Sequence, residues 1–425
     1  MERWGVFEVV CSGAQEGNPF VERELIGEFT SDCERKTVYG FYDGGGMYRV
    51  RFMPSFQGEY SFFLSGSALD EEVRGSFQVL PPSEGNHGPV YVSNGCHFAY
   101  ADGTPHFSFG TTCYVWALQS DEQIEATFDT LKRAPFNKVR FCVLPKHYDF
   151  NLREPRSYPF EGTPMDSSVI SSDNFFSYTG KSNGSQWDYE RPNPEHFRHL
   201  ERCISRLMEM GIEADIILFH PYDRWGFSTM MPEQDAFYLN YAVRRFAAYR
   251  NVWWSMANEY DLLAEKTTAQ WEALADLLCA SDPYGHLRSI HNCMAFYDHT
   301  RPWITHASIQ RQDFYRTTEY TDEWRERYRK PIVNDEIGYE GNIPHGWGNL
   351  SPQEIVRRFW EATLRGGYAG HGETYLSDDG ILWWSHGGTL KGESPARIAF
   401  LRKLVEELPC GLRRLPGAFD ELCAG

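Results

Sequence analysis

Short runs in which hydrophobic and polar residues alternate dominate the first part of the chain. Clusters of turn-forming residues, such as Asp43-Gly44-Gly45-Gly46, separate these runs. Strands of this length with Gly-rich turns between them are typical of antiparallel sandwiches. The pattern therefore predicts a small immunoglobulin-like β-sandwich over residues 1–80. Its strands are expected at residues 4–10, 38–42, 47–52, 60–64 and 75–80.

The pattern changes after a Pro- and Gly-containing linker, which we expect at residues 81–95. Apolar strand-like runs then alternate with helical patterns, which favours parallel β/α units. Strands are expected at residues 105–110, 138–144, 214–219, 251–256, 287–291, 303–307, 331–334 and 368–374. Helices are expected at residues 121–133, 194–210, 232–247, 267–279, 351–364 and 394–407. Eight such units predict a closed (β/α)8 TIM barrel over residues 96–410, with a tail at 411–425.

The longest connection of the expected barrel, residues 145–192, joins its second and third strands. It is rich in Pro, Ser, Asp and aromatic residues. The active site of a (β/α)8 barrel lies at the carboxyl ends of its strands. A long insertion on that face is expected to shape the substrate site.

Composition and charge narrow the class of protein. The 425 residues carry a formal net charge of −18, which argues against nucleic acid as a partner. No apolar run has the length of a membrane span, and the first residues contain no apolar leader segment. The ten Cys residues are scattered without zinc-finger spacing, as in proteins with reduced thiols. The expected localisation is cytoplasmic, without a membrane partner.

Two expected barrel strands end in acidic residues. The strand at 251–256 leads into Asn258-Glu259, and the strand at 331–334 leads into Asp335-Glu336. Retaining hydrolysis of a glycoside needs two carboxyl groups about 5–5.5 Å apart, one protonated and one ionised. Two strand ends across a barrel mouth can supply them. An isolated Asn-Glu pair would more often be a helix cap with a surface Glu, and spacing alone does not fix which acid is the nucleophile.

At this point the sequence resembles clan A glycoside hydrolases, whose fourth strand ends in Asn-Glu and whose seventh ends in Glu. Further motifs extend the resemblance to nearly the whole chain. They are Asn18-Pro19-Phe20, the segments 40–43 and 48–54, and Gly85-Asn86-His87-Gly88-Pro89 in the linker. These resemble the N-terminal sandwich domain of a group of bacterial clan A proteins whose barrels are related to apiosidase-like enzymes. The motifs are specific to fold and clan, not to substrate.

The resemblance implies roles for four residues. Glu259 would be the acid/base, Glu336 the nucleophile, and Asn258 a ligand of the sugar 2-hydroxyl. Arg140, in the second strand, would keep the nucleophile ionised, since a nearby guanidinium lowers the pKa of a carboxyl group. A structural salt bridge within the barrel is the alternative role for Arg140, and the two roles are compatible.

Seven further residues are weaker candidates for substrate binding. The polar ones follow expected strands three, six and eight, and the Trp residues lie in loops where a ring could stack on a sugar. Packing accounts for each Trp about as well as stacking does. The seven are His220, Asp223, His306, Trp116, Trp347, Glu373 and Trp384.

The function expected from these residues is retaining hydrolysis of an oligosaccharide or glycoside, with no cofactor and no metal. A metal hydrolase would usually show a close His pair on the first strand, where this chain has only His106. A carbohydrate-binding protein with an inactive barrel, or a transglycosidase with the same covalent intermediate, stays open. The sandwich is expected to pack on the barrel or to help form a homo-oligomer, with a carbohydrate-binding role as the alternative. The sugar, linkage and anomer are not fixed.

Overall fold

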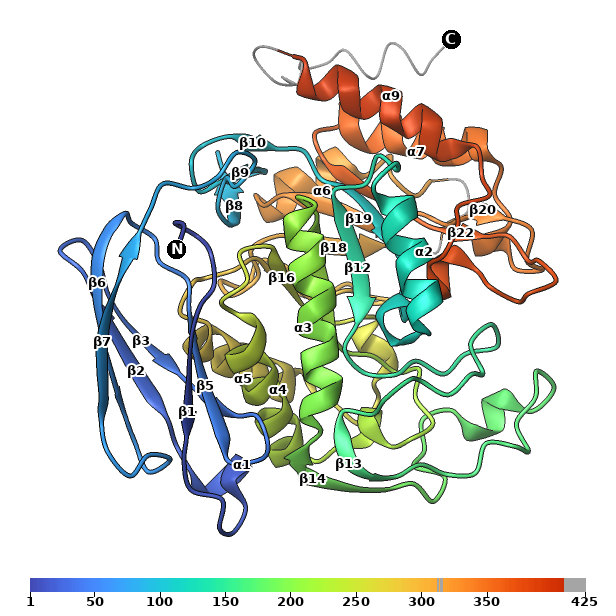
Figure 1. Cartoon of the computed structure of the whole chain (residues 1–425). Coiled ribbons are helices and arrows are strands. Elements are labelled where there is room, and N and C mark those ends of the chain that lie inside the picture. Colours follow the sequence, from blue (N-terminus) through green and yellow to red (C-terminus); the bar gives the residue numbers. More distant parts are fainter. Residues whose placement is uncertain (312, 314–315, 409–425) are drawn as a thin grey trace.

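The computed structural model describes residues 1–311, 313 and 316–408. An N-terminal pair of antiparallel sheets lies beside a larger body of parallel strands and helices (Figure 1). Among the helices of the described residues, none combines the length and apolarity that a membrane crossing needs.

The N-terminal sheets form the predicted sandwich. One sheet has the order β1-β5-β4 and the other β3-β2-β6-β7, with antiparallel neighbours throughout. Aromatic rings fill the space between them: Phe29 stacks on Phe52 and Phe7 on Phe77, with centroids 4.2 and 3.7 Å apart. The strands are β1 (Phe7–Ser12), β2 (Ile26–Thr30), β3 (Arg35–Tyr39), β4 (Phe41–Tyr42), β5 (Met47–Phe52), β6 (Gly58–Ser65) and β7 (Val73–Val79), and the short helix α1 covers Pro19–Glu22.

A small antiparallel sheet closes the amino-terminal end of the barrel. It comprises β8 (Val90–Ser93), β9 (His97–Tyr100) and β10 (Pro105–His106). Phe98 of β9 packs on Trp253 and Tyr368, which stand at the starts of two barrel strands, with centroids 5.0 and 5.1 Å apart. This end of the barrel is therefore filled with side chains, and the opposite end is left to form a site.

Eight parallel strands form the barrel, as the alternation of patterns predicts. Their order is β17-β16-β15-β12-β11-β21-β19-β18, and a parallel bridge between His291 and Ser308 joins the two outer strands. The fold class is thereby confirmed. The strands are β11 (Phe109–Thr112), β12 (Lys138–Cys142), β15 (Glu213–Phe219), β16 (Val252–Ala257), β17 (Arg288–Ser289), β18 (Ala307–Gln310), β19 (Ile332–Glu336) and β21 (Tyr368–His371).

Each expected barrel strand differs from the observed one at one end or both, and three of these differences move candidate site residues or the strand that should carry them. The run at 105–110 spans β10 of the small sheet and the start of β11, so the first barrel strand ends later than expected. The sixth strand begins at Ala307 and not at Trp303, because Trp303 and Ile304 are buried in a loop and give the same apolar signal. The eighth strand ends at His371, and β22 (Glu373–Thr374) pairs instead with β20 (Glu340–Gly341).

Helices follow most of the barrel strands, and several begin at a residue with a capping side chain. Ser120 accepts a hydrogen bond from the Gln123 amide, and Thr267 forms a capping box with Gln270. The helices are α2 (Asp121–Leu131), α3 (Pro194–Glu209), α4 (Pro232–Phe246), α5 (Thr268–Ser281), α6 (Thr321–Tyr328), α7 (Pro352–Leu364), α8 (Trp383–His386) and α9 (Ser394–Glu406). Single 3-10 turns cover Trp116–Leu118, Phe175–Tyr178, Phe227–Thr229, Tyr260–Leu262 and Gly346–Gly348. The long insertion contains a hairpin of β13 (Phe160–Thr163) and β14 (Gln186–Pro192).

The sandwich packs on helices α3 and α4 of the barrel (Figure 1) through a buried network of charges. Arg245 of α4 contacts Asp43 of the sandwich at 2.8 Å and Glu201 of α3 at 2.5 Å. Arg51 of β5 reaches the same Glu201 at 2.7 Å. Each buried charge thus has an opposite partner, which offsets the cost of its desolvation.

The barrel interior holds a second buried ion cluster beneath the mouth. Lys138 of β12 donates to Asp215 of β15 at 2.8 Å and to Asp335 of β19 at 2.6 Å. Burial favours the neutral acid, but the charges of Lys138 and Arg140 outweigh it and hold the pKa of Asp335 well below its usual range. The cluster links strands β12, β15 and β19, and it orients Asp335, the residue before Glu336.

Replacing Lys138 by Met is expected to lower the free energy of unfolding by about 3–5 kcal/mol, because two buried carboxylates lose their shared cation. Chemical denaturation of the variant and the wild type measures the difference. Lys132→Met is the matched control, since Lys132 pairs with Asp129 on the exposed face of α2. An unchanged denaturation midpoint for Lys138→Met would show that the cluster contributes nothing to stability.

Candidate active site

A cavity of about 240 Å³ opens at the carboxyl ends of the barrel strands. Glu259, just after β16, and Glu336, the last residue of β19, both line it. Much of the remaining wall is aromatic: Tyr114, Tyr148, Tyr222, Tyr339, Trp347 and Trp384. Lys146, Gln310, Arg311, Asp313 and Arg358 add polar and charged groups to the lining. The ionisation of two buried acids depends strongly on such neighbouring groups.

Glu259 is held in an uncommon backbone conformation. Its φ of 50° lies in the left-handed region, which costs free energy for a residue with a Cβ and is found most often at functional sites. Its carboxyl group accepts hydrogen bonds from Tyr222 and, at 2.5 Å, from Gln310 at the end of β18. Burial and the charge of Glu336 raise the pKa of Glu259 above its usual value, against opposing effects of Tyr222 and Lys146.

Glu336 is brought into the cavity by an irregularity of β19. Ser308 and Gln310 of β18 pair with Val333 and Glu336, so β19 carries one extra residue in this interval. Such insertions re-aim side chains, often next to active sites. The Tyr114 hydroxyl donates to the Glu336 carboxylate, and Nε2 of His291 lies 3.5 Å from it.

The pKa of Glu336 shifts in the direction opposite to that of Glu259. Burial alone would raise it, but the hydrogen bond and charge of His291, the Tyr114 hydroxyl and the charge of Arg140 lower it to about 2. At neutral pH Glu336 is therefore ionised, whereas Glu259 is the group of the two that holds a proton more readily. Opposite shifts in adjacent acids are the usual means of assigning one as the acid and the other as the base or nucleophile.

Arg140 and Asn258 support this pair from below. Arg140 is fully buried on β12 and donates to Asn258 at 2.8 Å and to Ser255 at 3.0 Å. The amide nitrogen of Asn258 in turn lies 3.4 Å from the Glu259 carboxyl group. Arg140 thus acts on Glu336 through its charge, while its direct hydrogen bonds orient Asn258.

Two of the three Trp residues expected at the site line the cavity. Trp347 and Trp384 have centroids 5.3 Å apart, and Trp384 meets Tyr114 edge to face. Trp116 instead packs on Phe128 and Phe141 beneath helix α2 and is fully buried. Its loop lies at the expected end of β11, but its ring belongs to the core.

Three of the polar candidates also lie outside the cavity lining. Asp223 accepts hydrogen bonds from the amides of Trp225, Gly226 and Ser228, and so stabilises its own loop. His220 is buried and contacts the Leu144 carbonyl at 3.2 Å. His306 precedes β18, because that strand begins one residue later, and its ring packs on Trp253 at the closed end of the barrel.

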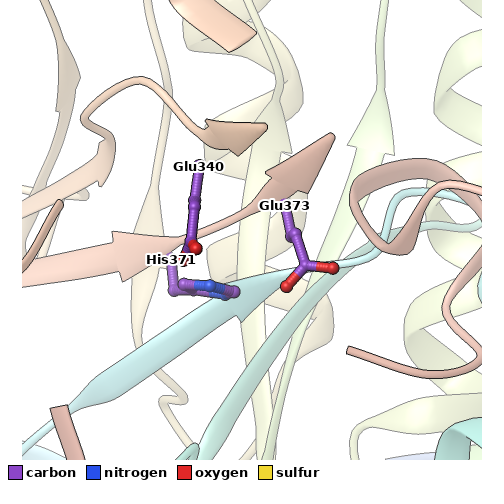
Figure 2. Close-up of side chains that lie close together, drawn as sticks. All are labelled: Glu340, His371 and Glu373. Carbon is purple, nitrogen blue, oxygen red and sulfur yellow. The ribbon is translucent and has the colours of Figure 1, made fainter. Parts of the chain in front are cut away.

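Glu373, the last candidate, belongs to a buried group beside the barrel together with Glu340 and His371 (Figure 2). Their potential ligand atoms lie within 4.8 Å of one another, the one such group of three found in the described part of the chain. The carboxylates accept hydrogen bonds from the four successive backbone amides of residues 391–394, which lead into helix α9. A Cβ at Gly392 would lie 2.5 Å from the Glu340 carboxyl carbon, so this close approach requires glycine. Through these hydrogen bonds the two carboxylates hold the segment before α9 in place.

Five residues of the site are not among the catalytic and substrate-binding residues that the sequence predicts. Gln310 and Tyr114 end or follow strands whose bounds differ from expectation, and His291 closes the barrel after β17. Tyr222 and Lys146 lie in loops, three residues beyond Phe219 and two residues beyond Leu144, where apolar runs end. A polar or aromatic residue just past each barrel strand is the signal that points to them.

Both parts of the chain are similar to known proteins. Residues 92–409 match the model of the family described as apiosidase-like, catalytic domain, and residues 1–66 match a domain of unknown function, DUF5060. A crystal structure described as "a putative glycoside hydrolase from Bacteroides vulgatus ATCC 8482" superimposes with a TM-score of 0.89 at 41% identity, over 96% of this chain and 78% of that one. Among curated proteins, none matches the chain.

More distant structures share the fold. A glycoside hydrolase family 5 protein, also from Bacteroides vulgatus ATCC 8482, matches with a TM-score of 0.53 at 17% identity, over 76% of this chain and 73% of that one. The resemblance that the motifs indicated is thereby confirmed. The chain belongs to the apiosidase-like family, with a (β/α)8 barrel as its catalytic domain.

Proposed function

We propose that this protein is a retaining glycoside hydrolase in which Glu336 is the nucleophile and Glu259 the acid/base. The observation that carries the proposal is the pair itself. Both acids line one cavity at the barrel mouth, and their pKa values are displaced in opposite directions. The family assignment and the glycoside hydrolase named among the solved relatives support the same reaction class.

In the first step the ionised Glu336 attacks the anomeric carbon, and Glu259 donates its proton to the departing glycosidic oxygen. This forms a glycosyl ester on Glu336 and breaks the glycosidic bond. In the second step Glu259, now ionised, takes a proton from water, and the resulting hydroxide displaces Glu336 from the sugar. Two inversions at one carbon give net retention.

The neighbouring residues fit this mechanism. Tyr114 and His291 stabilise the carboxylate of Glu336 before attack and release it as its charge is lost. Arg140 fixes Asn258 beside Glu259, where an amide can hold the 2-hydroxyl of the sugar. The rings of Trp347 and Trp384 offer an apolar surface for the face of a sugar.

A hydrolysis screen tests this function. The purified protein is incubated with aryl α- and β-glycosides, furanosides included, with and without EDTA, and the anomer first released is followed by NMR. We expect hydrolysis with retention that EDTA leaves unchanged. Inverted product would refute the double displacement. Binding without turnover would indicate an inactive carbohydrate-binding barrel, and new glycosides would indicate transfer.

The dependence of kcat/KM on pH should be asymmetric. Glu336 must be ionised, and its pKa of about 2 keeps it so through the accessible acid range. Glu259 must be protonated, so activity should fall as pH rises through its raised pKa. The control is a glycosyl fluoride, whose leaving group needs no proton and which should lack the basic limb. If activity fell at the same basic pH with both substrates, Glu259 would not be the general acid.

A further inference from the structure

Lys146 is a cationic side chain inside the catalytic cavity that the proposed mechanism does not use. It follows β12, is 3% exposed and lines the same cavity as Glu259 and Glu336. Its ammonium nitrogen stands 3.4 Å from the centroid of Tyr114, 4.4 Å from that of Tyr222 and 4.6 Å from that of Trp384. The three rings line the same cavity, so the ammonium group lies among aromatic faces of its wall.

This ammonium has no acceptor among the residues that the structure describes. No carboxylate oxygen of these residues lies within 4.0 Å of the Lys146 ammonium nitrogen, and it donates no hydrogen bond to them within 3.5 Å. The two catalytic acids are occupied by other donors: Gln310 and Tyr222 on Glu259, and Tyr114 on Glu336. Ring faces attract a cation but offset only part of the cost of burying it.

The charge of Lys146 nevertheless persists near neutral pH. Burial lowers its pKa to about 8, against the opposing charges that include Glu259 and Glu336. Lys146 therefore presents three N–H donors and a positive charge to the cavity, with no acceptor for them among the described residues. The group that fits this place is an anionic oxygen, because a charge-assisted hydrogen bond is roughly twice as strong as a neutral one.

We infer that Lys146 binds a carboxylate of the sugar beside Glu259 and Glu336, so that the substrates are glycosides of uronic acids. The claim that these glycosides are hydrolysed rests on the proposed function. The claim that a carboxylate binds Lys146 rests only on the structure of the cavity. The sugar's apolar ring face would lie against Trp384, its anomeric carbon at Glu336 and its carboxylate at Lys146. A neutral sugar would leave the ammonium with hydroxyl acceptors only.

Binding of free sugars tests the inference independently of hydrolysis. Calorimetric titration of the wild type with glucuronate, galacturonate and mannuronate is compared with titration by glucose, galactose and mannose. At least one uronate should bind tenfold or more tightly than its neutral counterpart. Lys146→Met should remove this preference, and Lys132→Met, which deletes one exposed positive charge on α2, should keep it.

The outcomes separate the inference from the proposed function. A wild type that binds a uronate without hydrolysing any glycoside would overturn the function and retain the inference. Hydrolysis of neutral aryl glycosides with no uronate bound or cleaved would overturn the inference and retain the function. Equal uronate affinity in Lys146→Met and the wild type would also overturn it.

Folding of Lys146→Met is checked by its thermal midpoint. Removal of an unpaired buried charge is expected to leave the midpoint unchanged or raise it, because no partner loses its counter-ion. Lys146→Gln, which keeps a donor but no charge, is the second variant. It should lose the uronate preference as Lys146→Met does; retained preference would mean that hydrogen bonding without charge selects the sugar, and would contradict the inference.

Discussion

Glu336→Gln should lower kcat on an aryl glycoside by a factor on the order of 10⁴ or more, whatever the leaving group. Gln has nearly the same shape and can still accept the hydrogen bond of Tyr114, so the cavity should keep its form. It cannot attack the anomeric carbon, and the neighbouring Asp335 cannot take its place, because that carboxylate is bound to Lys138 below the mouth. The loss should therefore appear equally with good and poor leaving groups.

Two comparisons make this result specific to Glu336. Glu125→Gln changes an exposed residue of α2 that pairs with Arg206, and it should keep wild-type kcat. Substrate or product binding to Glu336→Gln, followed by calorimetry, should stay within a few-fold of the wild type. A variant that retains activity within tenfold would exclude Glu336 as the nucleophile.

The sequence predicts those residues of the site that stand where an apolar strand ends and a charged residue follows. Glu259 and Glu336 each follow a run of buried side chains, and the change from apolar to acidic marks the end of the barrel strand. The same reasoning misplaces His306. The apolar run before it includes Trp303 and Ile304, which are buried in a loop, and burial alone does not distinguish a loop from a strand.

Other features depend on contacts between distant segments and leave no local pattern. Glu373 follows a barrel strand as expected, yet β22 pairs with β20, and the Glu373 carboxylate accepts hydrogen bonds from the amides that precede α9. In the sequence nothing distinguishes Lys146 from other loop residues, because the rings of Tyr114 and Tyr222 that contact it come from distant segments. The left-handed backbone of Glu259 is likewise set by its surroundings, since Glu has no intrinsic preference for it.

Replacement of Glu259 by Ala should separate the two chemical steps. With substrates whose leaving groups need a proton, kcat/KM should fall by about 10²–10⁴, the usual contribution of a general acid. With dinitrophenyl glycosides or glycosyl fluorides the first step should proceed at nearly the wild-type rate, because these groups depart as stable anions. The glycosyl ester on Glu336 should then accumulate, because no base remains to activate water, and a burst of leaving group should precede a slow steady state.

Azide distinguishes the roles of the two acids by the configuration of its product. In Glu259→Ala the lost side chain leaves space beside Gln310 and Tyr222 for a small anion, which can attack the ester without a base. The expected product is a glycosyl azide of retained configuration, together with a faster steady state. In Glu336→Ala azide would occupy the place of the nucleophile and give the inverted azide in one displacement. An inverted azide from Glu259→Ala and a retained one from Glu336→Ala would exchange the two assignments, because the product's configuration records which acid forms the bond to carbon.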